Sequence, residues 1–208
     1  MHEGFGDVPE EPDSPADCVT INTQTSQLEV SILQNDWRHD EWHDGLDALM
    51  DYVATLADKT MSLVLADKSF AALPDWLSYE WSVQLSDDAA IQILNENWRN
   101  KNKPTNVLSF PAQSGADLDM IFSNIKQEAQ KPAPPLLLGD IVLARETLMA
   151  EARAAGKPTL NHFAHLIVHG FLHLWGYDHQ QPAQADHMEA LEIKVLDCFD
   201  VPSPYEGA

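Results

Sequence analysis

The sequence has few cysteines and no long apolar runs, and each shortage excludes a class of protein. Only Cys18 and Cys198 occur among 208 residues, which argues against a disulfide framework or a thiolate metal site and favours a reducing compartment. No run approaches the roughly 18 apolar residues of a membrane helix. The first residues lack the basic and apolar segments of a secretory signal. We therefore expect a cytoplasmic protein with no membrane partner.

Basic residues are also scarce, with 12 lysines and arginines against 33 acidic residues and a formal net charge of −21. A charge of this sign argues against a nucleic-acid partner. The acids are unevenly distributed, however, since residues 1–20 hold six acids and no lysine or arginine. Arg99, Lys101 and Lys103 place three basic residues within five positions. Because salt screens charges over about 8 Å, such a cluster can act locally.

The length of 208 residues and a hydrophobic content of 44% predict one domain with one core. Residues 1–26 are rich in Pro, Asp, Glu, Ser and Thr, which predicts a disordered acidic tail. Residues 27–202 are predicted to form the domain, and residues 203–208 a short C-terminal tail.

The spacing of apolar residues predicts an α+β fold, in which about five helices pack on a mixed sheet of about four strands. Strands are expected at residues 27–33, 79–85, 107–110 and 136–143, the last of them central. Helices are expected at residues 41–59, 88–97, 146–155, 160–174 and 183–199, with weaker helical stretches at 60–72 and 120–129. Ser86 and Asp87 suit the capping position before helix 88–97. The polar connection 112–135 is long enough to predict a mobile or functional segment.

Three of the nine histidines lie in the block HGFLHLWGYDH, as His169, His173 and His179. Residues four apart share one face of a helix, so the first two imidazoles can reach one ion. Gly176 is suited to end the helix in a left-handed conformation, after which the chain can bring His179 to the same ion. A single histidine on a buried helix is more often a packing residue. Three at this spacing predict one zinc ion per chain, with a coordination position left open as in catalytic sites.

The same spacing occurs in the zincin-like helix of the metzincin metalloproteases, which have HExxHxxGxxH. Here Gly170 occupies the position of their general-base glutamate. Its absence removes a contribution of about 10²–10⁴-fold to peptide hydrolysis. A phosphodiester is the better target, because a metal and a nearby cation together stabilise the charge of its transition state.

The cation for that phosphate is expected from the basic cluster. Arg99 is predicted between a helix and a strand, and its planar guanidinium suits a phosphate. On spacing alone it could also be a solvated arginine at a helix end. Lys101 and Lys103 are predicted to guide the substrate strand, or else to be plain loop charges. Trp98 is predicted to lie in the core rather than to stack on a base.

The block HGFLHLWGYDH resembles the HGxLHLxGYDH signature of the YbeY family, which are bacterial single-strand-specific metallo-endoribonucleases. NENWRNKNKPTNVLSFP and LLLGDIVLARE resemble that family's other two blocks in the same order, and the resemblance extends over roughly residues 28–200. Departures are Trp98, where Tyr is usual, Asn102, where Asp is usual, and the longer connection 112–135.

The resemblance implies a zinc ion held by His169, His173 and His179, and a functionally important arginine at Arg99. It also implies action in 16S rRNA 3′-end maturation and ribosome quality control. The implied partners are single-stranded RNA or rRNA and the ribosome or its small subunit, with no DNA expected.

Two other functions stay open on the sequence, namely a zinc metalloprotease-like hydrolase and a ribosome-assembly module whose metal is structural. Smaller points also stay open. His165 could support the metal site or only pack its helix, and Asp178 could orient a metal-bound imidazole. The nucleophile could be water or the substrate 2′-OH.

Overall fold

The computed structural model of the chain describes residues 17–22, 26–32, 37, 45–68, 77–125 and 134–205. These residues form a five-stranded sheet in the order β1-β2-β3-β5-β4. The strands are β1 (Asp17–Asn22), β2 (Ser26–Ile32), β3 (Tyr79–Ser86), β4 (Val107–Pro111) and β5 (Leu136–Ala144). β2, β3 and β5 run parallel, whereas β1 and β4 are antiparallel to their neighbours. The predicted mixed sheet and the interior place of residues 136–143 are therefore confirmed.

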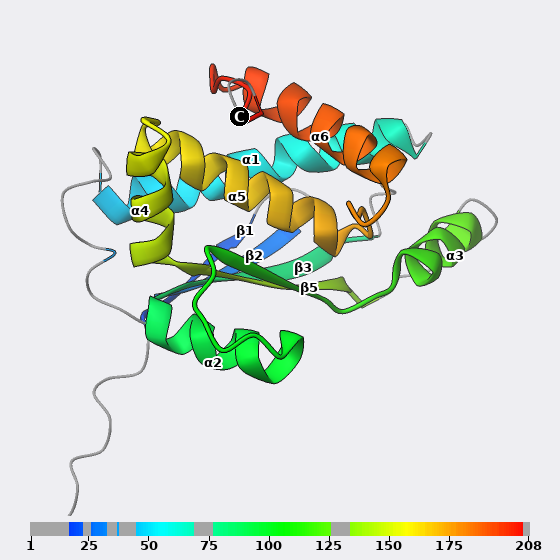
Figure 1. Ribbon diagram of the computed structural model, residues 1–208. Coiled ribbons are helices and arrows are strands. Elements are labelled where there is room, and N and C mark those ends of the chain that lie inside the picture. Colours follow the sequence, from blue (N-terminus) through cyan, green and yellow to red (C-terminus); the bar gives the residue numbers. More distant parts are fainter. Residues whose placement is uncertain are drawn as a thin grey trace, which may run out of the picture.

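Six helices occur among the described residues, and they lie mainly on one face of the sheet (Figure 1). They are α1 (Gly45–Asp67), α2 (Asp88–Arg99), α3 (Gly115–Ile125), α4 (Arg145–Ala154), α5 (Thr159–Leu174) and α6 (Pro182–Asp197). Figure 1 shows α1, α4, α5 and α6 above the sheet, α2 below it, and α3 beyond one end. None of the helices in the described part of the chain has the length and apolar character needed to cross a membrane.

The core lies between the sheet and the helices above it. In β3, Tyr79, Trp81, Val83 and Leu85 are buried and alternate with half-buried polar residues, as expected for a strand with one packed face. α5 is covered by the sheet, α1 and α6, so that its residues Phe163, Ile167 and Phe171 are fully buried. This central position makes α5 a rigid base for the side chains at its C-terminal end.

α2 covers the opposite face near the β4 edge, where Ile91 packs with Leu108 and Val142. Asp87 caps the helix as predicted, because its side chain accepts a hydrogen bond from the Ala90 backbone N–H at 2.7 Å. The helix ends at Arg99, followed by Asn100 in the left-handed conformation. Arg99 therefore lies beside the edge strand β4.

The structure corrects two expectations about the N-terminal part of the chain. The disordered tail predicted for residues 1–26 is wrong at Asp17–Asn22, which forms β1 and pairs with β2. The β-branched residues Val19, Thr20 and Ile21 favour a strand, but its partner is needed to form it. Residues 1–16 and 23–25 lie outside the described residues. The second correction is that α1 continues through Asp67 without the break expected near residue 60.

The described part of the predicted C-terminal tail is held against the domain. Lys157 donates a hydrogen bond from Nζ to the Pro204 carbonyl at 2.7 Å, and the Tyr205 hydroxyl donates one to Glu192. Tyr205 thus belongs to the domain, and residues 206–208 lie outside the described part of the chain.

Candidate metal centre

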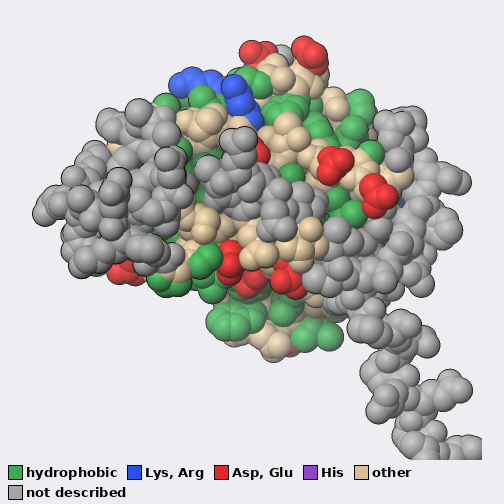
Figure 2. Space-filling view, turned by 180° about the vertical axis from the view of Figure 1, so that it is seen from behind, with side chains coloured by type: hydrophobic (Ala, Val, Ile, Leu, Met, Phe, Trp, Pro, Cys, Tyr) green, Lys and Arg blue, Asp and Glu red, His purple; other side chains and the backbone are tan. Residues whose placement is uncertain are grey.

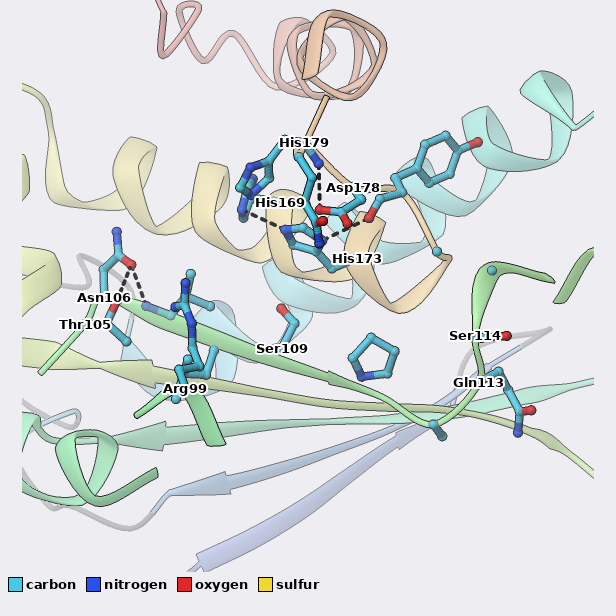
Figure 3. Close-up of a pocket in the computed structure, with 18 residues that line it drawn as sticks. Arg99, Thr105, Asn106, Ser109, Gln113, Ser114, His169, His173, Asp178 and His179 are labelled. Atoms are coloured by element: carbon cyan, nitrogen blue, oxygen red, sulfur yellow. Dashed lines mark hydrogen bonds between the residues drawn. The ribbon is translucent and has the colours of Figure 1, made fainter. Parts of the chain in front are cut away.

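A cavity of about 880 Å³ opens between the C-terminal end of α5 and the edge strand β4. Figure 3 shows the histidines on one side of it and Arg99, Thr105, Asn106 and Ser109 on the other. The side formed by α5 and the following turn contributes His169, His173, Gly176, Tyr177, Asp178, His179 and Gln180. The opposite side contributes Arg99, Thr105, Asn106, Val107, Leu108, Ser109, Pro111, Ala112, Gln113, Ser114 and Gly115.

The predicted turn after α5 is confirmed. Gly176 has a φ of 81°. Its N–H donates to the His173 carbonyl at 3.0 Å, and the Tyr177 N–H donates to the Leu172 carbonyl at 3.1 Å. This pair of bonds is the Schellman arrangement that ends a helix and reverses the chain. A Cβ at Gly176 would lie 2.6 Å from the Gly115 Cα, so the turn also needs glycine for its close contact with α3.

The structure brings the three predicted histidines together. One ring nitrogen from each of His169, His173 and His179 lies within 4.8 Å of the other two. The Nε2 atoms of His169 and His173 are 3.1 Å apart. A tetrahedral zinc ion with bonds of about 2.0–2.1 Å separates its ligands by about 3.3 Å, so this spacing suits such an ion.

The hydrogen bonds of the two helix histidines point their lone pairs at each other. Nδ1 of His169 lies 2.8 Å from a Glu192 oxygen, and Nδ1 of His173 lies 2.9 Å from the Tyr177 carbonyl oxygen. Both partners are acceptors, so each Nδ1 carries the proton and each Nε2 keeps a free lone pair. Two lone pairs at 3.1 Å repel unless a cation lies between them. The donor set therefore fits a divalent metal ion.

Protonation of His173 is also disfavoured. Burial, together with the neighbouring His169 and His179, lowers the pKa of His173 from 6.5 to about 4. His173 is consequently neutral at pH 7, which is the form that binds a metal.

Glu192 supports the centre from α6 and was not predicted from the sequence. The fully buried carboxylate contacts the ring nitrogens of His169 at 2.8 Å and His165 at 3.1 Å, and it also accepts from the Tyr205 hydroxyl. Burial raises the pKa of Glu192, but the hydrogen bonds from His165 and His169 outweigh it and lower the pKa to about 2. An ionised carboxylate of this kind orients the His169 ring and increases its basicity as a ligand.

A sequence signal for Glu192 existed. The residue falls on the buried stripe of α6, four positions after Met188 and three before Val195. An acid within an apolar stripe is rarely buried without a partner. The identity of that partner, 23 residues earlier on α5, depends on how the two helices pack.

The structure supports a role for His165 at the metal site but shows no hydrogen bond between Asp178 and an imidazole ring of the described residues. His165 shares Glu192 with His169, so it supports the site rather than only packing α5. His165, His169 and Glu192 form a second group whose ligand atoms are close enough to hold a metal ion. The oxygens of Glu192, however, already accept hydrogen bonds from the two rings. The Asp178 side chain accepts a hydrogen bond from the backbone N–H of His179 at 2.8 Å. The ring of His173 is oriented by the Tyr177 carbonyl and not by Asp178.

The basic cluster is divided by the structure. Arg99 lines the cavity opposite the histidines (Figure 3). Lys101 and Lys103 are exposed in the following loop, outside the residues that line the cavity. Their predicted role in guiding a strand stays a prediction.

The expectation that Trp98 lies in the core is wrong, because 70% of its surface is exposed. Trp98 continues the stripe of Ile91 and Asn95, which are buried, on the same face of α2. Trp98 contacts Phe110 of β4, which is an edge strand. The described sheet has no further strand next to β4 that could cover the last turn of α2.

Close packing explains why residue 170 is a glycine. A Cβ at this position would lie 3.1 Å from the Ile141 side chain and 3.1 Å from the Ser109 Oγ. The position that holds the general-base glutamate in the metzincins is therefore occupied here by the close contact of α5 with β4 and β5. A side chain there would require the Ile141 and Ser109 side chains to shift by a few tenths of an ångström.

Three imidazoles at the wall of an open, polar cavity define a class, the α+β proteins with a candidate catalytic rather than a closed structural metal centre. The family model described as Endoribonuclease YbeY matches residues 43–200. The chain belongs to the endoribonuclease YbeY family, so the resemblance found in its motifs is confirmed.

Two similar relatives are both named Endoribonuclease YbeY. The protein from Paramagnetospirillum magneticum is 47% identical over 133 residues, which cover 64% of this chain and 74% of the relative. The protein from Azorhizobium caulinodans is 39% identical over 180 residues, or 86% of this chain and 96% of the relative. The solution structure of TM1509 from Thermotoga maritima aligns over 76% of this chain and 93% of that chain, at 19% identity and a TM-score of 0.43.

Proposed function

We propose that this protein is a zinc-dependent endoribonuclease that cleaves single-stranded RNA in the cytoplasm. Within that activity we propose a role in 16S rRNA 3′-end maturation and ribosome quality control, with the ribosome or its small subunit as partner. Membership of the family supports the reaction class. The observation that carries the proposal is the convergence of His169, His173 and His179 across one cavity from Arg99.

The histidines would hold one zinc ion, which when bound supplies a Lewis acid and a coordination position for an oxygen of the reaction. Glu192 and the Tyr177 carbonyl keep His169 and His173 in the tautomer that presents Nε2. The guanidinium of Arg99 binds the phosphate from the other wall and stabilises its growing negative charge.

The size and lining of the cavity support a single strand as substrate. A volume of about 880 Å³ lies within the range of about 300–1,000 Å³ typical of small-molecule sites, so it admits a short segment of strand rather than a double helix. The neutral side chains of Asn106, Ser109, Gln113 and Ser114 line it. Their amides and hydroxyls suit a ribose 2′-OH, the group that distinguishes RNA from DNA.

Asp178 is the only carboxylate among the described residues that line the cavity. We assign it as the proton acceptor for the attacking hydroxyl, whether this comes from water or from the ribose. Analysis of the product ends separates the two routes, because a 2′,3′-cyclic phosphate forms only by attack of the 2′-OH. An Asp178→Asn variant that keeps both its turnover and its pH profile would rule out the assignment.

A pair of variants tests the proposed function. We expect His173→Ala to lose zinc and cleavage together, and Arg99→Ala to keep zinc and the fold but lose cleavage of a single-stranded RNA. Zinc content, circular dichroism and cleavage are measured on both.

Other outcomes of this test lead to different functions. Unfolding of His173→Ala, with no RNA cleavage by the zinc-loaded parent, indicates a structural metal in an assembly module. Turnover of casein by a preparation without ribonuclease activity indicates a protease.

A further inference from the structure

We infer that Trp98 is a stacking platform for one unpaired base of the RNA strand. The inference rests on the proposed function and adds a base-binding site to it. Trp98 is the most exposed large hydrophobic side chain among the described residues, at 70%. Isolated exposed apolar residues are common, so exposure alone does not indicate a site. A site is indicated by the position of Trp98, its contact with Phe110 and the charges around it.

The ring of Trp98 packs on β4, the strand that forms part of one wall of the cavity. It packs edge to face against Phe110, with ring centroids 5.8 Å apart and an angle of 68° between the rings. Phe110 stands in β4 between Ser109 and Pro111, which both line the cavity. Successive side chains of a strand point to opposite faces, so the aromatic pair lies on the other face of the same edge strand.

α2 carries exposed hydrophobic side chains on the side of the sheet opposite most of the helices (Figure 1). Figure 1 places α2 below the sheet, and Figure 2 shows hydrophobic side chains on the surface at that lower end of the molecule. The large exposed hydrophobic residues of α2 are Ile93 and Trp98. A face of the Trp98 ring is thus accessible to a flat ligand, while its edge contact with Phe110 restrains its rotation.

Positive charges stand next to the ring on a loop that is itself fixed. Arg99 points to the cavity, and Lys101 and Lys103 are exposed immediately afterwards. The loop is tied to α2 by hydrogen bonds from the Gln92 amide to the Asn102 side chain, at 2.6 Å, and from the Asn95 amide to the Lys103 carbonyl, at 2.7 Å. An exposed aromatic ring beside positive charges is the combination that binds single-stranded nucleic acid.

The charge of the cluster favours RNA over a second copy of this chain as the occupant. A second copy of this chain would bring its own basic cluster against the same surface, whereas phosphates on both sides of a stacked base match Arg99 and the two lysines. A strand with one phosphate at Arg99 would cross the edge of β4 and place a neighbouring base on Trp98. A base held in a duplex is already stacked and cannot take this position, so Trp98 also favours single strands.

Steady-state cleavage of a single-stranded oligoribonucleotide by the zinc-loaded protein tests the inference. We expect Trp98→Ala to raise KM about 5- to 150-fold, the factor for about 1–3 kcal/mol per stacked base, with little change in kcat. Trp98→Tyr should restore most of the affinity. Ile93→Ala is the matched control, since it removes an exposed apolar side chain from the same helix and should leave KM unchanged.

Two further measurements identify the contact as stacking. An abasic residue is moved along the oligonucleotide, and at one position it should raise the KM of the wild type to that of Trp98→Ala while leaving the variant unaffected. Mixing with RNA should also quench a part of the tryptophan fluorescence that is missing in Trp98→Phe. Trp37, Trp81 and Trp175 are buried and contribute little to that quenching.

The outcomes separate the inference from the function on which it rests. If the wild type cleaves RNA and Trp98→Ala matches Ile93→Ala in KM, the platform is disproved and the endoribonuclease stands. If Trp98→Ala changes only the sedimentation of the protein, the ring is a protein contact and the inference is wrong. If the wild type neither binds nor cleaves RNA, both proposals fall.

Discussion

The two walls of the cavity are built in different ways. The histidine wall comes from one continuous segment, the end of α5 and the turn after it, and the rings of His169 and His173 are held by partly buried hydrogen bonds to Glu192 and the Tyr177 carbonyl. The opposite wall combines the last residue of α2 with β4 and the start of α3. It carries Arg99 among neutral amides and hydroxyls.

This difference assigns the two walls different functions. The histidine wall presents imidazole nitrogens on rings oriented by hydrogen bonds, and it suits a metal. The opposite wall carries a positive charge and exposed hydrogen-bonding groups, and it suits a phosphate and a sugar. Changes in the first wall should therefore affect metal binding, and changes in the second should affect substrate while leaving the metal in place.

The largest separable effect is expected at Arg99. Arg99→Ala should lower kcat by about 10²–10³, the typical loss when one group that stabilises transition-state charge is removed. Arg99→Lys should recover part of the rate, because a lysine keeps the charge but not the planar pair of donors. Zinc content should be unchanged in both. Arg153→Ala, which removes an exposed arginine of α4, is the control for loss of one positive charge. Loss of zinc from Arg99→Ala would contradict the division between the walls.

A smaller effect is expected on the histidine wall at Glu192. Glu192→Gln should weaken zinc binding about 10- to 100-fold, since the carboxylate holds the His169 ring. Tyr205→Phe, which removes one hydrogen bond to Glu192, should have a weaker effect in the same direction. Competition with a chromophoric chelator measures the affinity, and Asp186→Asn on the exposed side of α6 serves as control. Equal affinities in all variants would show that Glu192 only fills space.

Acid should destabilise the zinc-free protein in two steps. The pKa of His173 is lowered from 6.5 to about 4 on folding, and that of Glu192 from 4.5 to about 2. In both cases the unfolded chain binds more protons, so the free energy of unfolding decreases as the pH falls, first between 6.5 and 4 and then between 4.5 and 2. One proton gives a slope of at most about 1.4 kcal/mol per pH unit.

Urea unfolding of the chelated protein at a series of pH values measures this slope. His173→Gln should flatten it in the upper window and leave the lower window unchanged. If the free energy of unfolding changed with pH in the same way for the wild type and His173→Gln, a buried neutral imidazole at His173 would be contradicted. Zinc should shift the loss of stability to lower pH, because it competes with protons for the same nitrogens.

The smallest effect is expected at the lysines outside the cavity. If Arg99, Lys101 and Lys103 each contact a phosphate, the logarithm of the binding constant should fall with the logarithm of salt concentration with a slope of about −2. Replacing both lysines with alanine should reduce the slope to about −0.7, and Lys194→Ala on α6 should not change it. A slope near zero for the wild type would rule out the cluster as an RNA clamp.

Local interactions explain which features were predictable. The spacing of His169 and His173 specifies one helix face, and Gly176 specifies a left-handed turn, so the convergence of the three histidines was correctly expected. The cap at Asp87 was predicted for the same reason, because its hydrogen bond reaches only three residues along the chain.

Features that depend on a distant partner were missed or wrong. Glu192 and Tyr205 contribute to the histidine wall through contacts made only when α6 and the C-terminal residues pack on α5. Trp98 has the spacing of a buried residue, yet it is exposed because the sheet ends at β4. β1 exists because β2 offers it an edge, and the composition of the first residues obscured this.

Spacing within short segments was enough to predict the three candidate metal-ligating histidines, the class of fold and the resemblance to the family. Tertiary structure alone decided that Arg99 faces those nitrogens, that Glu192 holds one of them, and which aromatic ring meets solvent. Each of these depends on where separate elements end relative to one another, and no periodicity within a single segment records that.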